Sequence, residues 1–229
     1  ATLYNKDIIG TVWSIRTTIP ILAIYLFLVL PGKNIFFHTN PWLLKYTDTM
    51  YFFIIISLAV IKLNNEVLGL STKHLKGNLT VGFLSGGILI SALILLDFSI
   101  DLTSLADQEL FSNTKNISYP PLTNHSLDYV VAVLVIPIIE QVFFTGIVFQ
   151  SFLKKFNPIL SIYALGIIYS LAGFKLSLGA FGLGIITCLL FKYTKTIYAS
   201  TIFHSSCVMG EILIKYLYPR LNTVLSFLF

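Results

Sequence analysis

Three ionisable side chains lie deep inside long apolar stretches of the sequence. They are Glu140, His204 and Glu211. An ionisable group near the middle of a membrane helix costs about 2.5–3.5 kcal/mol on insertion scales, so such residues mark functional sites. A carboxyl group in these surroundings can accept or donate a proton, and an imidazole can stabilise developing charge. We therefore predict that Glu140 and His204 are the catalytic residues of any chemistry in this chain.

Other polar residues accompany these two along the chain. Gln141 follows Glu140 directly, and Pro137, which lacks a backbone donor, is expected to kink the helix just before the carboxylate. Glu211 comes seven residues after His204, two helical turns later, so both should share one helix face. We predict that Gln141, Thr145 and Glu211 complete a polar cavity around the catalytic pair.

The same residues do not form the usual metal or serine sites. No His-Glu-x-x-His motif is present, and of the four histidines only His204 lies in an apolar span. Zinc normally takes more nitrogen or sulfur ligands than that, so we predict no metal and no cofactor. No Gly-x-Ser-x-Gly motif supports a serine nucleophile. The basic residues occur singly or in pairs, and this argues against a nucleic-acid partner.

The elements that must position these residues follow from composition. The chain has 229 residues, of which 56% are hydrophobic and only 11% charged. A soluble domain carries about 25% charged residues. So little charge cannot cover so much apolar surface in water, which excludes a soluble enzyme, a disordered chain and a nucleic-acid binder. The composition is typical of a polytopic membrane protein.

Apolar stretches of about 17–25 residues can cross a hydrocarbon layer of about 30 Å. They predict an all-α, polytopic membrane helical bundle with about seven transmembrane helices in a single domain over residues 1–229. The fifth and sixth stretches are short and are expected to form a tight hairpin, in which Ala180 and Gly184 make a small-xxx-small packing seam. The predicted spans are Ile8–Leu30, Thr47–Leu63, Leu79–Leu96, Tyr129–Leu153, Asn157–Phe174, Leu176–Phe191 and Ile197–Leu217.

The distribution of basic residues between the loops predicts an orientation. With the N-terminus in the cytoplasm, nine Lys and Arg residues lie on the cytoplasmic side and six on the outer side. This bias favours a cytoplasmic N-terminus. The outer set is Lys33, Lys45, Lys115, Lys175, Lys215 and Arg220. The first apolar stretch is too long for a signal peptide and has no small-residue cleavage site after it, so we expect it to be retained.

The seven residues from Glu140 to Gly146 resemble a known motif. They read Glu-Gln-Val-Phe-Phe-Thr-Gly, which is similar to the Glu-Glu-x-x-Phe-Arg-Gly motif of the CAAX protease and bacteriocin-processing family, also called CPBP or Abi. The position of His204 near the start of the last span resembles that family's His-x-x-x-Asn motif. The stretch Gly69–Leu79 is similar to the family's juxtamembrane stretch. The resemblance covers about residues 62–217.

The resemblance implies a helical membrane bundle and, in active members, a glutamate-type intramembrane protease. In that family a glutamate and a middle-motif histidine activate water, and a later histidine and asparagine stabilise the oxyanion. Glu140 matches the glutamate, and His204 matches the later histidine. Four other polar positions depart from the pattern. The second acidic position is Gln141, the arginine position is Thr145, the middle-motif histidine position is Gly173, and the asparagine position is Val208.

These departures bear on activity. Gly173 and Val208 lack side-chain groups that the family mechanism uses, and losing one oxyanion donor typically costs about 2.7–4 kcal/mol. The first hypothesis is therefore a degenerate member that binds or regulates a membrane partner or peptide, as in sensor-kinase regulation or bacteriocin self-immunity. An alternative is an active CAAX-type intramembrane endopeptidase that uses Glu140. Another alternative is a small proton-coupled transporter that uses Glu140 and Glu211.

The expected partners follow from these hypotheses. They are a membrane peptide or the transmembrane helix of another protein, together with the lipid bilayer. The sequence leaves homo-oligomerisation open. The resemblance implies integral insertion in a bacterial cytoplasmic membrane.

Overall fold

Helices form all the regular structure in the described part of the chain. The computed structural model describes residues 13–62, 68–102, 126–172, 177–217 and 221, and within these ranges it contains helices and no strand. Five helices in these ranges are long and apolar enough to cross a membrane. This finding confirms the predicted all-α membrane bundle.

The first span is longer at its C-terminal end than predicted. It runs from Ile15 to Phe36 and continues past Pro31 instead of ending at Leu30. Pro31 lies in the first turn of a helical segment that follows a π-helical stretch, where the missing backbone N–H is tolerated. The span consists of α2 (Ile15–Ile24), the π-helical η1 (Tyr25–Val29) and α3 (Leu30–Phe36).

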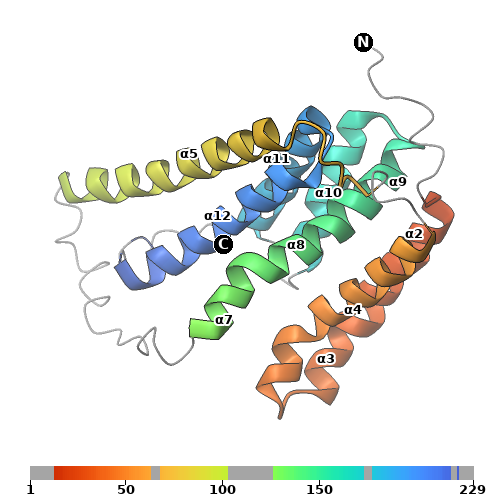
Figure 1. Ribbon diagram of the computed structural model, residues 1–229. Helices are drawn as coiled ribbons and strands as arrows, with labels where there is room; N and C mark the ends of the chain where they lie inside the picture. Colours follow the sequence, from red (N-terminus) through yellow and green to blue (C-terminus); the bar gives the residue numbers. More distant parts are fainter. Residues whose placement is uncertain (1–12, 63–67, 103–125, 173–176, 218–220, 222–229) are drawn as a thin grey trace.

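The second span, α4 (Pro41–Lys62), begins six residues before the predicted start at Thr47. The side chain of Asn40 accepts a hydrogen bond from the backbone N–H of Leu43 at 3.2 Å. This cap satisfies one of the otherwise unpaired donors of the first turn, and Pro41 occupies a position where no donor is needed. In Figure 1 these first two spans form a separate pair, drawn in orange, beside the central green helix.

Two long helices pack side by side along the bundle. They are α5 (Leu75–Leu102) and α12 (Ile197–Leu217), which carries His204; Figure 1 shows them in yellow and blue. Gly82 allows the close approach, because a Cβ atom there would lie 2.9 Å from the Cβ of Ile202. The bounds of α12 coincide with the predicted span.

The central span carries Glu140 and is one continuous helix. It consists of α7 (Ser126–Val130), the π-helical η5 (Val131–Val135), α8 (Ile136–Gln141), the π-helical η6 (Val142–Phe149) and α9 (Gln150–Leu153). All eight residues of η6 are buried, as expected for a helix that is surrounded on every side. The π-helical stretch before α8 accommodates Pro137, and such stretches often occur at functional sites.

The predicted helical hairpin of two short segments is present. The helices α10 (Pro158–Ala172) and α11 (Leu178–Thr194) are 15 and 17 residues long, whereas a helix needs about 20 residues to cross the layer. A count of seven full spans is therefore not confirmed. At Gly184, in the predicted packing seam, a Cβ atom would lie 2.9 Å from the Cα of Gly166.

An aromatic cluster joins the first two spans to the central helix and α10. The ring centroids of Tyr25 and Phe52 lie 4.8 Å apart, and those of Phe52 and Phe143 lie 4.4 Å apart. Phe144 continues the cluster to Tyr169 at 4.4 Å. Such pairs contribute about 0.5–1.5 kcal/mol each beyond the area they bury. The cluster therefore holds four helices around the segment that contains Glu140.

The segment just before α5 packs against the motif. The backbone N–H of Ile197, the first residue of α12, donates to the carbonyl of Gly69 at 3.0 Å. Gly69 has a φ of +80°, which favours glycine. A Cβ atom on Gly146 would lie 2.8 Å from the carbonyl oxygen of Leu68. The motif glycine thus lets the juxtamembrane stretch lie directly on the central helix.

Candidate functional site

The structure brings together the two residues that the sequence predicts to be catalytic. Glu140 lies in α8, and His204 lies in the second turn of α12. The distance from Glu140 Oε2 to His204 Nε2 is 3.7 Å, and the two side chains are 24% and 7% exposed. Glu140 is thus the more accessible member of a carboxyl–imidazole pair within the bundle.

Gln141 connects this pair to the surrounding helices. Its Nε2 donates to the Tyr169 hydroxyl at 2.6 Å and to His204 Nδ1 at 3.2 Å. Because Nδ1 accepts this bond, the hydrogen-bond network assigns the imidazole proton to Nε2, the nitrogen that faces Glu140. His204 therefore presents a donor beside the carboxyl group.

Thr145 completes the network one helical turn after Gln141. Its hydroxyl donates to Gln141 Oε1 at 2.6 Å, so both ends of the carboxamide are bound. Gln141 and Thr145 are fully buried. A neutral pair at positions i and i+4 thus stands where the family motif has glutamate and arginine, which could pair as ions at the same spacing.

Tyr169 is a member of the site that the sequence does not single out. In the structure its ring meets the His204 imidazole edge-on, with centroids 6.3 Å apart. Its hydroxyl accepts the Gln141 bond in an otherwise apolar region. The sequence signal that could have identified Tyr169 is its hydroxyl group, which lies within an otherwise apolar stretch.

The remaining predicted site residues are not all in this network. Glu211 does not join it, because its side chain is 64% exposed and forms an ion pair with Lys215 at 2.6 Å. The structure thus does not bring Glu211 to the predicted polar cavity. Val208 lies on α12 one turn after His204 and offers no hydrogen-bonding group. Gly173 lies outside the described residues.

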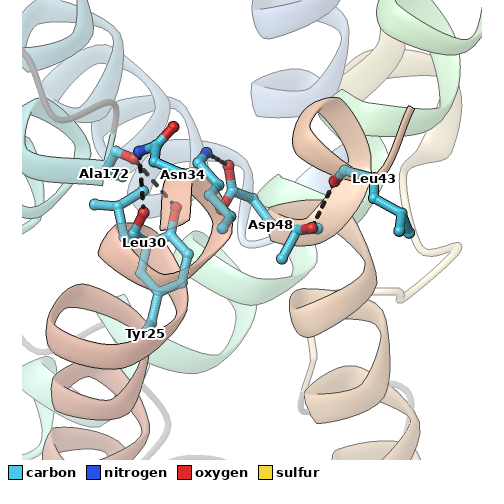
Figure 2. Close-up of polar contacts among 8 residues, drawn as sticks. Tyr25, Leu30, Asn34, Leu43, Asp48 and Ala172 are labelled. Atoms are coloured by element: carbon cyan, nitrogen blue, oxygen red, sulfur yellow. Dashed lines mark hydrogen bonds and ion pairs between the residues drawn. The ribbon is translucent and has the colours of Figure 1, made fainter. Parts of the chain in front are cut away.

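A second polar group, also missed, lies on the first two spans. Lys33 of α3 and Asp48 of α4 form an ion pair, with side chains 17% and 21% exposed. We predicted Lys33 in an outer loop, whereas it lies inside the first helix. Figure 2 shows Tyr25 on the first span and Asp48 on α4. The Tyr25 hydroxyl donates to the carbonyl of Ala172 at 3.2 Å.

No metal-binding cluster is found in the described part of the chain: there, no three His, Cys, Asp or Glu side chains lie close enough to hold an ion. The described site is thus a carboxyl group, an imidazole donor and a neutral hydrogen-bond network. Such an arrangement can bind a peptide group, and it can orient a water molecule beside Glu140.

Comparison with protein families supports the resemblance seen in the motifs. Residues 122–210 match the family described as type II CAAX prenyl endopeptidase Rce1-like. This match confirms the resemblance to the CAAX protease family over that segment, which includes Glu140, Gln141, Thr145, Tyr169 and His204. No curated protein and no solved structure matches the chain.

Proposed function

We propose that the protein binds a membrane-embedded peptide, or a transmembrane helix of a partner protein, in a glutamate-type site with little or no turnover. The observation that carries this proposal is the network centred on Gln141. It satisfies every hydrogen-bonding atom of the carboxamide and leaves Glu140, which is 24% exposed, beside the Nε2–H of the buried His204.

A carboxyl acceptor next to an imidazole donor suits a peptide in a membrane. Backbone N–H and C=O groups in lipid need internal partners, and each unsatisfied group costs several kcal/mol. Glu140 can accept from a peptide N–H, and His204 can donate to a peptide C=O. A segment with locally unpaired backbone groups would therefore gain the most from this site.

The same network argues against ordinary hydrolysis. The amide of Gln141 cannot take up a proton, as a carboxylate at the family's second acidic position could. The position that aligns with the oxyanion asparagine is Val208, and loss of one such donor typically lowers the rate by about 100- to 1000-fold. Roles consistent with binding alone are regulation of a membrane sensor kinase and self-immunity to a bacteriocin-like peptide.

Two fluorescent probes test the proposal on the full chain in detergent. One is a farnesylated peptide with a C-terminal C-a-a-X sequence, and the other is a peptide with about 20 apolar residues. We expect at least one to bind, Glu140→Gln to retain affinity within about threefold, and Gln141→Leu to lose it. The double variant Glu211→Gln/Lys215→Gln removes an exposed ion pair outside the network and serves as the control. Failure of both probes to bind contradicts the proposal.

A second candidate function is peptide hydrolysis, which the 3.7 Å approach of Glu140 to His204 favours. Here Glu140 would act as general base, and the His204 Nε2–H would stabilise the oxyanion. Mass spectrometry of the same probes after incubation with the protein distinguishes the two. Cleavage by the natural chain that is lost in Glu140→Ala would establish hydrolysis and rule out a binding-only role.

A further inference from the structure

An ion pair between two membrane-spanning helices needs an explanation beyond packing. Lys33 lies in the last turn of the first span and Asp48 in the first half of the second, where a charge costs less than at the centre of a span but is still favoured by a partner. Replacing a buried ion pair by apolar side chains is often neutral or stabilising, so such a pair is weak evidence for a stabilising role. One carboxyl oxygen of Asp48 faces Lys33, whereas its Oδ1 is buried without a hydrogen-bond partner among the described residues.

The pair lies close to the Glu140 site. Asp48 precedes Phe52 by four residues on α4, so the two side chains share a face. The Phe52 ring stacks on Phe143 at 4.4 Å, and Phe143 follows Glu140 by three residues on the central helix. The contact between Phe52 and Phe143 therefore joins the helix of Asp48 to the helix of Glu140.

Tyr25 marks the boundary between the two polar groups. Its ring is 1% exposed and stacks on Tyr51 at 5.6 Å. Its hydroxyl satisfies the carbonyl of Ala172, the last residue of α10, which would otherwise lack an intrahelical partner. Through Tyr25, Phe52 and Phe143, ring packing therefore connects the span that carries Lys33 to the helix that carries Glu140.

We propose that Lys33 and Asp48 form a second binding centre of the same site and take one peptide group of the bound segment. The ammonium of Lys33 donates to the peptide carbonyl, and the carboxylate of Asp48 accepts from the peptide N–H. This inference rests on the proposed function, because it names how the first two spans contribute to peptide binding.

The chemistry of the pair matches a peptide group better than a charged ligand. Lys33 and Asp48 together carry no net charge, and they present a donor and an acceptor side by side, which is the complement of an amide dipole. An ammonium has three donors, and Asp48 directs one oxygen to Lys33 while Oδ1 is unused by the described residues. Both residues precede residue 122, where the family match begins, so this centre would set the selectivity of this chain.

Binding of the farnesylated C-a-a-X peptide to the full chain in detergent tests the inference. The double variant Lys33→Gln/Asp48→Asn should weaken binding by about 10- to 100-fold, as expected for loss of hydrogen bonds to charged groups worth about 1.5–3 kcal/mol. The double variant Glu211→Gln/Lys215→Gln, which neutralises an exposed pair elsewhere, should bind within about twofold of the natural chain. Equal affinity of the two double variants overturns the inference.

A change in the peptide itself identifies the contacted group. Replacing each of the last three peptide bonds by an ester removes one N–H donor at a time. We expect one ester to weaken binding to the natural chain by about tenfold and to have no effect in Asp48→Leu, which has no acceptor, as a double-mutant cycle requires for a direct contact. If no ester shows this coupling, or if amidating the terminal carboxylate alone accounts for the loss, the peptide-group assignment is wrong.

Folding and function are separated by two further comparisons. If Lys33→Gln/Asp48→Asn does not fold, Lys33→Met/Asp48→Leu supplies an apolar pair of similar volume. It should fold and still bind at least about tenfold more weakly. If the natural chain binds neither probe, the proposed function itself fails. If binding depends on Gln141 but is unchanged in the folded Lys33 and Asp48 double variants, only the second centre is rejected.

Discussion

Replacement of Gln141 by leucine perturbs the candidate site at its most connected residue. The carboxamide of Gln141 makes hydrogen bonds with Tyr169, His204 and Thr145. Leucine is similar in size but has no polar atoms, so the substitution removes all three bonds without opening a large cavity. The three partners are buried, and water cannot readily replace the lost bonds.

The expected loss of stability follows from counting the groups left without a partner. A buried polar group without a hydrogen bond costs about 1–3 kcal/mol. The Thr145 hydroxyl can turn to a backbone carbonyl of its own helix, so the Tyr169 hydroxyl and His204 Nδ1 remain. The free energy of unfolding should fall by about 2–6 kcal/mol. At about 2–4 °C per kcal/mol for a chain of this size, the unfolding midpoint falls by about 4–24 °C.

Cys207 is partly exposed, so all variants carry Cys207→Ser. A thiol-reactive fluorogenic dye then measures this midpoint at Cys188, which is fully buried in the folded chain. The matched control is Ser151→Ala, because Ser151 is also buried on the central helix but donates to the carbonyl of Val148 in that same helix. We expect a smaller fall for the control, since that bond joins no second helix. Equal falls for the two variants, or a midpoint for Gln141→Leu within about 2 °C of the natural chain, would refute the reasoning.

Three further predictions address the motif, the hairpin and the orientation. Gln141→Glu and Thr145→Arg should each destabilise the chain by several kcal/mol as unpaired buried charges, whereas the double variant should recover part of the loss in thermal unfolding, because the two charges can pair. Gly184→Ala should lower the midpoint, because its Cβ would lie 2.9 Å from a backbone atom of α10, whereas Gly182→Ala, with nothing within 4 Å, should not. Burial, and then the charge of a neighbouring lysine, lowers the pKa of Lys195. The neutral amine of Lys195 is therefore present at lower pH than that of an ordinary lysine. An impermeant amine reagent added on the cytoplasmic side should label Lys195, and the labelling rate should begin to rise at lower pH than for an exposed lysine. Labelling only from the outer side would reverse the predicted orientation.

Sequence reasoning predicts the helices well because the thickness of the membrane sets their length. The bounds of α12 coincide with the predicted span, and each of the other long helices contains most of its predicted stretch. The ends are less predictable, because they depend on local hydrogen bonds. The Asn40 cap starts α4 six residues early, and a π-helical stretch lets the first span continue past Pro31. Hydropathy does not contain this information.

The site is predictable where its residues are close in sequence. Gln141 and Thr145 interact because four residues separate them on one helix. Helical periodicity also indicates which way a side chain faces, but not whether another helix covers that position. Glu211 shares the face of His204, yet it lies about 10.5 Å further along the helix axis, where it is exposed and pairs with Lys215. The Lys33–Asp48 pair depends on how α3 packs on α4, which no local pattern records.

The departures from the family motif at Gln141 and Thr145 are physically linked. Each alone would leave a buried charge without its ion-pair partner, at a cost of about 3–5 kcal/mol. Together they exchange a charged i, i+4 pair for a neutral one that closes with a 2.6 Å hydrogen bond. No side-chain nitrogen or oxygen of Gln141, Thr145 or His204 is buried without a partner. The polar groups of this network are therefore satisfied within the protein, as the proposed binding function requires.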